Sequence, residues 1–134
     1  MSVKKFMYIN RKAPYGTVYA LESLEVVLIG AAFDQDVSLA FIGDGVYQLT
    51  NGQNTEAIGQ KNFSPTYAAL GDYDVNKIYV EKESLEARGL TIDDLQHLTW
   101  EDEDEDWAEK DSIQVVTAAE LAELMDQQDV VLSF

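Results

Sequence analysis

The side chains that could carry chemistry in this chain are a glutamate, a single histidine and a run of acids. Glu81 stands in YVEKESLEARGL, residues 79–90, where a strand is expected to run directly into a helix. In α/β proteins the carboxyl ends of strands collect reactive groups, because loops and helix N-termini converge there. Glu81 could act as a general base, although nothing near it in the sequence supplies an acid or an electrophile. The helix dipole also stabilises a carboxylate in a first turn, and this structural role explains Glu81 better.

Cysteine is absent from the 134 residues, and this absence excludes several kinds of chemistry. The chain can form no disulfide, no thiolate nucleophile and no thiolate metal ligand. His97, in QHLTW, is the only histidine, and we expect it late in a short strand among apolar residues. It has no second histidine with which to bind a metal ion, so we interpret it as an ordinary surface or core side chain. We therefore predict no catalytic residue, no metal site and no cofactor.

The glycine-containing loop GDGVYQL, residues 43–49, does not match a phosphate-binding motif. It carries Gly43 and Gly45 but has Gln48 where a dinucleotide fingerprint needs its third glycine. It also follows the second expected strand rather than the first. The chain contains no Walker-type phosphate loop, so the sequence does not indicate an ATPase.

The run EDEDEDWAEKD, residues 101–111, is the strongest compositional feature. Blocks of like charge are usually solvated and self-repelling, and we expect a solvent-exposed loop here. The alternatives are a docking surface for a basic partner and a weak divalent-cation site, although the run lacks the glycine of an EF-hand loop. Trp107 within the run favours a partner contact, because tryptophan is enriched at the centres of interfaces.

The net charge of the chain limits the kinds of molecule that it is expected to bind. Nine basic and 25 acidic residues give a net charge of -16, which repels phosphate backbones and anionic lipid headgroups. We therefore expect no direct contact with nucleic acid or membranes. No apolar run is long enough to span a bilayer, and the first residues show no signal-peptide pattern. The expected location is the cytoplasm.

Strands alternate with helices along the whole chain. Apolar β-favouring runs predict strands at Val3–Ile9, Val37–Ile42, Lys77–Val80, Ile113–Val116 and Val130–Phe134. Helical spacing and caps predict helices at Thr17–Phe33, Pro65–Leu70, Lys82–Arg88 and Ala118–Gln127, with shorter helical segments at Thr55–Lys61 and after Thr91. Parallel strands need crossover connections, so this alternation predicts a single domain over residues 1–134, with a mainly parallel sheet between helical layers.

Several sequence blocks together resemble one family. They are KKFMYINRKAPYGTVYALESLEVVLIGAAFDQDVSLAFIGDGVYQL, then GQ, FSPTY, LGDYD, SLEARGL and the ending DVVLSF. In combination these blocks resemble the DsrF/TusC branch of the DsrE/DsrF sulfur-relay family, and most closely DsrF of sulfur-oxidising bacteria. The acidic run matches none of its motifs.

The resemblance implies a flavodoxin-like α/β fold and a place in a heterohexamer with two copies of each of three homologous subunits. The partners would be DsrE/TusD-like and DsrH/TusB-like chains, and a DsrC/TusE-like carrier protein would receive the sulfur. The DsrF branch serves sulfur oxidation, and the TusC branch serves 2-thiolation of tRNA. In the sister subunit the acceptor cysteine lies eight residues before the glycine of an RG pair. Counting back from Gly89, that position is Glu81, so the resemblance implies a non-catalytic subunit.

The predicted contacts with partners are aromatic residues, because such side chains are enriched at interfaces. The candidates are Tyr15, Tyr47, Phe63, Tyr67 and Trp107. Two other functions stay open. One is a flavodoxin-like domain that binds a small ligand between APYGT and GDGVYQL. The other is a homo-oligomer of the same wider family.

Overall fold

The structure is a computed structural model that describes residues 4–12, 27, 36–50 and 75–134. Apart from Val27, which is helical, the helices predicted before residue 75 lie outside the described residues. No helix in the described ranges has the length and apolar character needed to cross a bilayer.

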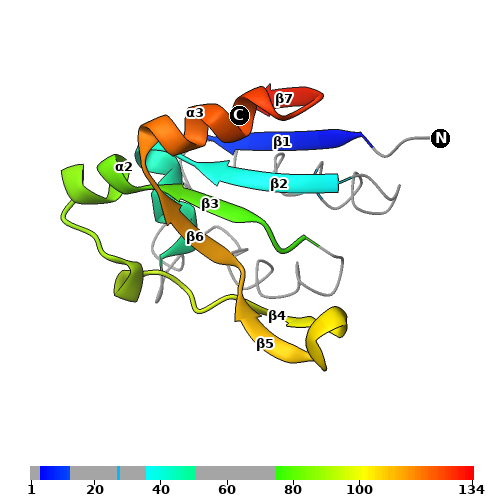
Figure 1. Cartoon of the computed structure of the whole chain (residues 1–134). Helices are drawn as coiled ribbons and strands as arrows, with labels where there is room; N and C mark the ends of the chain where they lie inside the picture. The colour runs from blue at the N-terminus through cyan, green and yellow to red at the C-terminus, as the bar shows by residue number, and fades with distance from the viewer. Residues whose placement is uncertain (1–3, 13–26, 28–35, 51–74) are drawn as a thin grey trace, which may run out of the picture.

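A five-stranded parallel sheet forms the centre of the described structure (Figure 1). Its order is β6-β3-β2-β1-β7, and every neighbouring pair is parallel. The strands are β1 (Lys5–Asn10), β2 (Asp36–Phe41), β3 (Ile78–Glu81), β6 (Ile113–Val116) and β7 (Val130–Ser133). The predicted α/β class is confirmed, with strand ends shifted by one or two residues.

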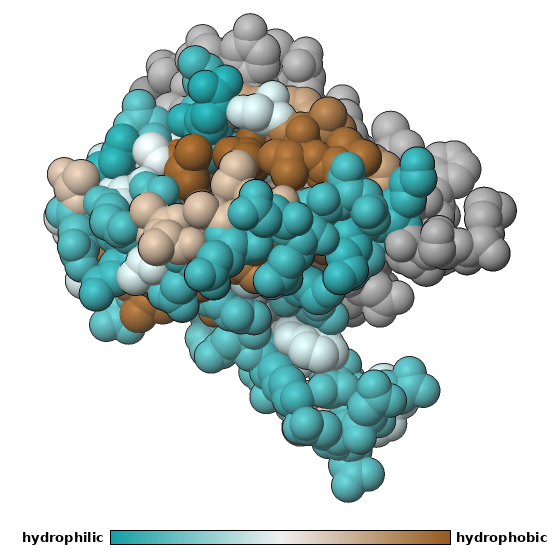
Figure 2. Space-filling view, turned by 45° about the horizontal axis from the view of Figure 1, so that its top comes forward, coloured by the Kyte–Doolittle hydropathy of each residue, from teal (hydrophilic) through white to brown (hydrophobic). Residues whose placement is uncertain are grey.

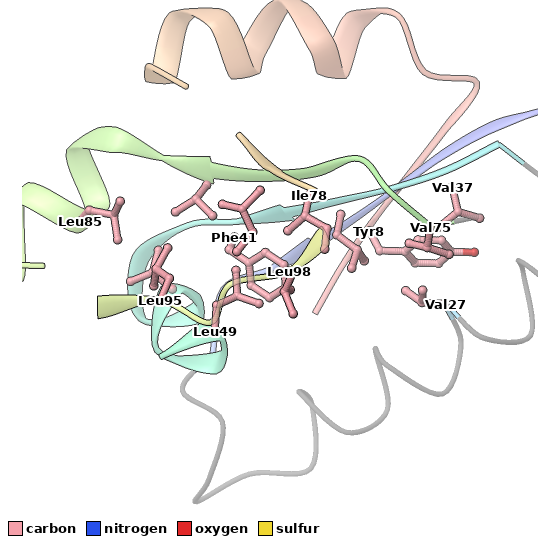
Figure 3. Packing of buried hydrophobic residues seen from close by; sticks show 14 residues of the cluster. Tyr8, Val27, Val37, Phe41, Leu49, Val75, Ile78, Leu85, Leu95 and Leu98 are labelled. Carbon is pink, nitrogen blue, oxygen red and sulfur yellow. The ribbon is translucent and has the colours of Figure 1, made fainter. Parts of the chain in front are cut away.

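The alternation of side chains along the strands divides the core into two clusters. In a strand, successive side chains point to opposite faces of the sheet. The larger cluster on one face includes Tyr8, Leu39, Phe41, Ile78 and Val80, and Figure 3 shows how it packs. The smaller cluster on the other face consists of Met7, Ile9, Ala40, Tyr79 and Leu121. The sheet is therefore buried on both faces, as its nearly continuous apolar strands predict.

The strand order decides which face each connection covers. β1, β2, β3 and β6 follow one another in one direction, and β7 returns to the far side of β1. Crossover connections between parallel strands are right-handed. Connections that lead to the next strand in one direction along the sheet therefore cover one face, and a connection that leads in the opposite direction covers the other face. Val27, Val46, Leu49 and Leu85 accordingly belong to the larger cluster, whereas Leu121 of the returning connection belongs to the smaller one. The three layers are those predicted, but in flavodoxin itself the second strand, not the last, lies beyond the first.

Two helices have the caps that the sequence predicts. Helix α2 (Lys82–Ala87) ends in a Schellman motif, in which the Leu90 and Gly89 amides donate to the carbonyls of Leu85 and Glu86. Gly89 has a φ of +67°, which glycine tolerates best. Helix α3 (Ala118–Asp126) begins at Thr117, which forms a capping box with Glu120.

The short helical segment after Thr91 is also confirmed. Thr91 caps the 3-10 helix η4 (Ile92–Asp94), and Asp94 completes the capping box by accepting from the Thr91 amide at 2.8 Å. His97 lies between η4 and the next strand rather than in a strand, so that prediction is wrong. Backbone hydrogen bonds from the Asp94 and Leu95 amides to the carbonyls of Thr91 and Ile92 complete this single turn.

The acidic run is a hairpin and not the loop predicted from its charge. Strands β4 (Thr99–Asp102) and β5 (Ala108–Asp111) pair antiparallel around the 3-10 turn η5 (Glu103–Glu105). Lys110 Nζ contacts Asp102 at 2.6 Å and Glu105 at 2.9 Å, and it lies 5.8 Å from the Trp100 ring centre. The hydrogen bond to Asp102 is the main reason why the pKa of Lys110 is raised and that of Asp102 is lowered. Lys110 thus offsets part of the repulsion between carboxylates on which the loop prediction was based.

Candidate functional site

The carboxyl ends of β3 and β6 mark the point where the connections of the sheet diverge. Glu81, the last residue of β3, pairs with Val116 of β6. After Glu81 the chain continues as α2 toward the larger cluster, and after Val116 it continues as α3 over the smaller cluster. In open α/β sheets such a divergence is where ligands bind. Glu81 therefore stands at the strand-to-helix corner that the sequence predicts.

The carboxylate of Glu81 is held by a buried serine. Ser84 Oγ donates a hydrogen bond to Glu81 Oε1 at 2.5 Å and accepts one from the Gly43 amide at 2.8 Å. Ser84 is only 5% exposed. Its hydroxyl therefore joins the N-terminus of α2 to the segment that follows β2, with Glu81 as the acceptor at the end of this chain of hydrogen bonds.

The segment Gly43–Leu49, predicted as a loop, is the 3-10 helix η1. A Cβ added to Gly45 would lie 1.9 Å from the Asn10 carbonyl oxygen, so only glycine permits this approach of η1 to β1. Arg88 Nη2 and Nε donate to Asp44 Oδ1 at 3.0 and 3.1 Å, and Arg88 Nη1 donates to the Ser84 carbonyl. These contacts tie η1 to the C-terminus of α2, so the segment is fixed from both sides.

The N-terminus of α3 is capped by carboxylates of the chain itself. Both Glu83 oxygens accept from the Ala118 amide, at 2.9 and 3.1 Å. Glu120 Oε1 accepts from the Thr117 amide at 3.0 Å, and this bond is the main reason why the pKa of Glu120 is lowered. Helix N-termini attract anions through their free amides and dipole. Here Glu83 and Glu120 already occupy those amides.

The chemistry of this corner follows from its side chains. Glu81 and Glu83 make it acidic, and the sequence supplies no thiol. Carboxylates repel an incoming anion such as a persulfide, and without a thiolate no covalent sulfur intermediate can form on the chain. Among the described residues no group of three or more histidine, aspartate or glutamate side chains could hold a metal ion. The hydrogen bonds of Glu81, Ser84 and Glu83 link α2 to Gly43–Leu49 and to the start of α3.

The relationship to known proteins agrees with this geometry. Residues 4–134 match the DsrE/DsrF-like family. The chain belongs to this family. It is 61% identical over 132 residues, 98% of its length, to the "Intracellular sulfur oxidation protein DsrF" of Allochromatium vinosum, of which it covers 97%.

Two further relatives are more distant members. The chain is 38% identical over 93 residues to a "Protein TusC homolog" of Vibrio vulnificus, which is 69% of this chain and 79% of that protein. It is 35% identical over 88 residues to "Protein TusC" of Escherichia coli, which is 66% of this chain and 74% of that protein. Among solved structures, the ychN protein of E. coli aligns with a TM-score of 0.73 at 21% identity, covering 98% of this chain and all of that one. This last similarity concerns the fold.

In this DsrE/DsrF-like chain the structure describes two of the aromatic candidates, Tyr47 and Trp107. Tyr47 lies in η1 and is 36% exposed, and Trp107 lies at the turn of the acidic hairpin and is 62% exposed. Tyr15, Phe63 and Tyr67 lie outside the described residues. The His97 side chain is 77% exposed, and its Nε2 lies 3.6 Å from Asp111 Oδ1.

Sequence reasoning missed three residues of the corner of this family member. Ser84 has a weak signal, since a serine three residues after a strand-ending glutamate lies in the same helical turn. Glu83 has no such signal in the sequence, because it accepts a hydrogen bond from the amide of Ala118, which is 35 positions away. Asn10, whose carbonyl oxygen faces Gly45, could be found only from the packing of η1 against the end of β1, which the sequence does not show.

Proposed function

We propose that this chain is a non-catalytic subunit of a DsrEFH-type sulfurtransferase complex that serves dissimilatory sulfur oxidation. The observation that carries the proposal is the 61% identity to a DsrF protein over nearly the whole length of both chains. The absence of cysteine determines the kind of subunit. A persulfide must be attached to a thiolate sulfur, so a partner has to supply it.

The partners in this proposal are homologous DsrE-like and DsrH-like chains. Two copies of each of the three chains form the complex, and a DsrC-like carrier takes up the sulfur. The charge of -16 disfavours direct contact with nucleic acid or anionic membranes, and it fits a protein that works among other proteins in the cytoplasm. Glu81 and its neighbours hold the corner in shape, and the chain completes the complex and supports persulfide transfer by the cysteine of the partner subunit.

The main alternative within the family is a TusC-like subunit of the relay for tRNA thiolation. The TusC relatives are 35–38% identical over about two thirds of this chain. The greater identity and coverage of the DsrF relative favour sulfur oxidation. No observation favours a flavodoxin-like ligand site.

The deciding experiment is co-expression of this chain with the DsrE-like and DsrH-like chains of the same genome, followed by native mass spectrometry. The expected result is one complex whose mass corresponds to two copies of each chain. Loading with a persulfide donor should add sulfur to the DsrE-like chain and none to this one. A chain that remains alone would contradict the proposal.

The choice of pathway needs a separate measurement on the same complex. The purified complex is loaded with sulfane sulfur and offered either a DsrC-like or a TusE-like carrier. Transfer to the DsrC-like carrier alone is expected for the sulfur-oxidation role. Preferential transfer to the TusE-like carrier would assign the chain to tRNA thiolation instead.

A further inference from the structure

A pocket lies at the base of the acidic hairpin, away from the Glu81 corner. Its volume is about 260 Å³, and its apolar wall includes Ile92, Leu98 and Ile113. These residues come from η4, the segment before β4 and the start of β6. Small-molecule pockets usually measure about 300 Å³ or more, so this one suits a single side chain better than a nucleotide or flavin.

One polar group in the pocket wall has no hydrogen-bond partner. Gln96 lines the pocket, and its side-chain Nε2 is buried without any acceptor. A buried donor without a partner is costly, and most such groups in proteins are satisfied. A half-turn of the terminal amide exchanges its nitrogen and oxygen, so Gln96 can offer the pocket a donor or an acceptor. Gln96 is therefore a polar residue of the pocket wall whose hydrogen bonds are incomplete within the described structure.

Two carboxylates give the pocket its charge. Asp93 and Asp111 both line it, and Asp111 Oδ1 lies 3.6 Å from Nε2 of His97. Asp93 has no ion-pair partner among the residues that the structure describes. The hairpin beside the pocket, residues 99–111, contains eight acidic residues and one lysine. It projects from the body of the molecule as the hydrophilic lobe at the bottom of Figure 2. Its field attracts cations toward the pocket.

We propose that this pocket binds an arginine side chain on the surface of a partner protein. The apolar wall accommodates the aliphatic stem, and Asp93 and Asp111 pair with the guanidinium group. Arginine fits better than lysine, because its planar fork can donate to two acceptors at once and it is more weakly hydrated. The Gln96 amide then pairs with the partner's backbone, which offers both donors and acceptors. The proposal does not depend on a role in sulfur transfer.

The direct test is an NMR titration of the full-length, ¹⁵N-labelled chain with N-acetyl-arginine methylamide. Saturable shifts are expected at the Gln96 side-chain amide and at the backbone amides of Leu98 and Ile113. The neutral isostere N-acetyl-citrulline methylamide is the control ligand and should shift these signals at least about tenfold more weakly at equal concentration, because it lacks the charge. Absence of saturable shifts, or equal binding of both compounds, would overturn the proposal.

Matched variants separate the pocket from the general acidity of the hairpin. Asp93→Asn with Asp111→Asn removes two charges at the pocket and should weaken arginine binding by about tenfold. Glu101→Gln with Glu109→Gln removes the same number of charges from paired hairpin residues outside the pocket, and it should change binding less than about twofold. Equal weakening in both variants would show attraction to the acidic surface only and would reject the pocket.

Discussion

At the scale of single residues, Ser84 links parts of the Glu81 corner, although it was not among the candidate residues predicted from the sequence. Its hydroxyl accepts from the Gly43 amide and donates to the Glu81 carboxylate. Both bonds are made by one oxygen atom that is itself buried. Glu81 is therefore an acceptor in a hydrogen-bond network that joins α2 to the segment after β2.

Replacing Ser84 with alanine should lower the free energy of unfolding by about 1–3 kcal/mol, because the Gly43 amide loses its acceptor and Glu81 loses its donor. Urea denaturation followed by circular dichroism measures this change. Ser112→Ala is the matched control, since Ser112 is equally buried but its hydroxyl forms no hydrogen bond with a described residue. The control should be nearly neutral. Similar losses in both variants would remove the special role of Ser84.

At the scale of elements, Gly45 and Gly89 are glycines for two different structural reasons. Gly45 has space for no side chain, because η1 approaches the backbone of β1. Gly89 has open space around it but a positive φ at the end of α2. The first constraint comes from contact between elements and the second from the geometry of one helix end.

Gly45→Ala should therefore destabilise the chain far more than Gly89→Ala. The added methyl group at position 45 meets backbone atoms at 1.9 and 2.6 Å, so β1 and η1 must separate, at a cost of about 3 kcal/mol or more. At position 89 the cost is the left-handed conformation alone, about 1–2 kcal/mol. Thermal unfolding of both variants measures the difference. The reverse order of stability would mean that η1 does not approach β1 as described.

The start of α3 should show a pH dependence that comes from Glu120. The pKa of this carboxyl is lowered in the folded chain, chiefly by the Thr117 amide and then by the Thr117 hydroxyl. Its ionised form therefore stabilises the fold above the ordinary pKa of 4.5, and that contribution is lost as the pH falls through the lower folded value. Glu120→Gln should be less stable than the wild type at neutral pH, and the difference should shrink in acid.

Urea titrations at pH 7, 5 and about 3.5 at low protein concentration follow this difference. Glu123→Gln provides the comparison, because Glu123 lies on the same helix and has no hydrogen bond to a described residue. This variant removes a charge from α3 without removing a capping hydrogen bond. A Glu120→Gln deficit that persists unchanged in acid would assign the effect to something other than ionisation.

At the scale of the whole molecule, the surplus of acidic residues dominates. A net charge of -16 on 134 residues makes the compact state repel itself. Ion pairs such as Lys77 with Asp36 and Arg88 with Asp44 are too few in the described structure to offset it. A partner with basic side chains would relieve part of this repulsion.

Sodium chloride should accordingly stabilise the isolated chain. Raising the ionic strength from about 0.01 to 0.15 M shortens the screening length from about 30 to 8 Å, which weakens long-range repulsion more than close ion pairs. Differential scanning calorimetry should show a melting temperature that rises with salt and levels off. Sucrose at equal osmolality is the control for non-ionic effects. A melting temperature that falls with salt would mean that attractive ion pairs outweigh the repulsion.

The sequence by itself determined the local features of this protein. Apolar β-favouring runs predicted the strands, the Thr117 and Thr91 caps predicted helix starts, Gly89 predicted the end of α2, and the missing cysteine excluded a persulfide on this chain. These properties depend on residues within a few positions of one another. The prediction failed within the acidic run, because its like charges indicate a loop and the sequence does not show that Lys110 contacts Asp102 and Glu105 across a hairpin.

Only the tertiary structure decided which face each connection covers and which residues meet at the carboxyl edge of the sheet. The return of β7 to the far side of β1 sends α3 across the face opposite α2, and the two helix starts diverge beside Glu81. Glu83 then reaches Ala118, Ser84 reaches Gly43, and Asp93 shares a pocket with Asp111. These contacts join residues far apart in the sequence. They form because the order of the strands, together with right-handed crossovers, decides which connections lie side by side.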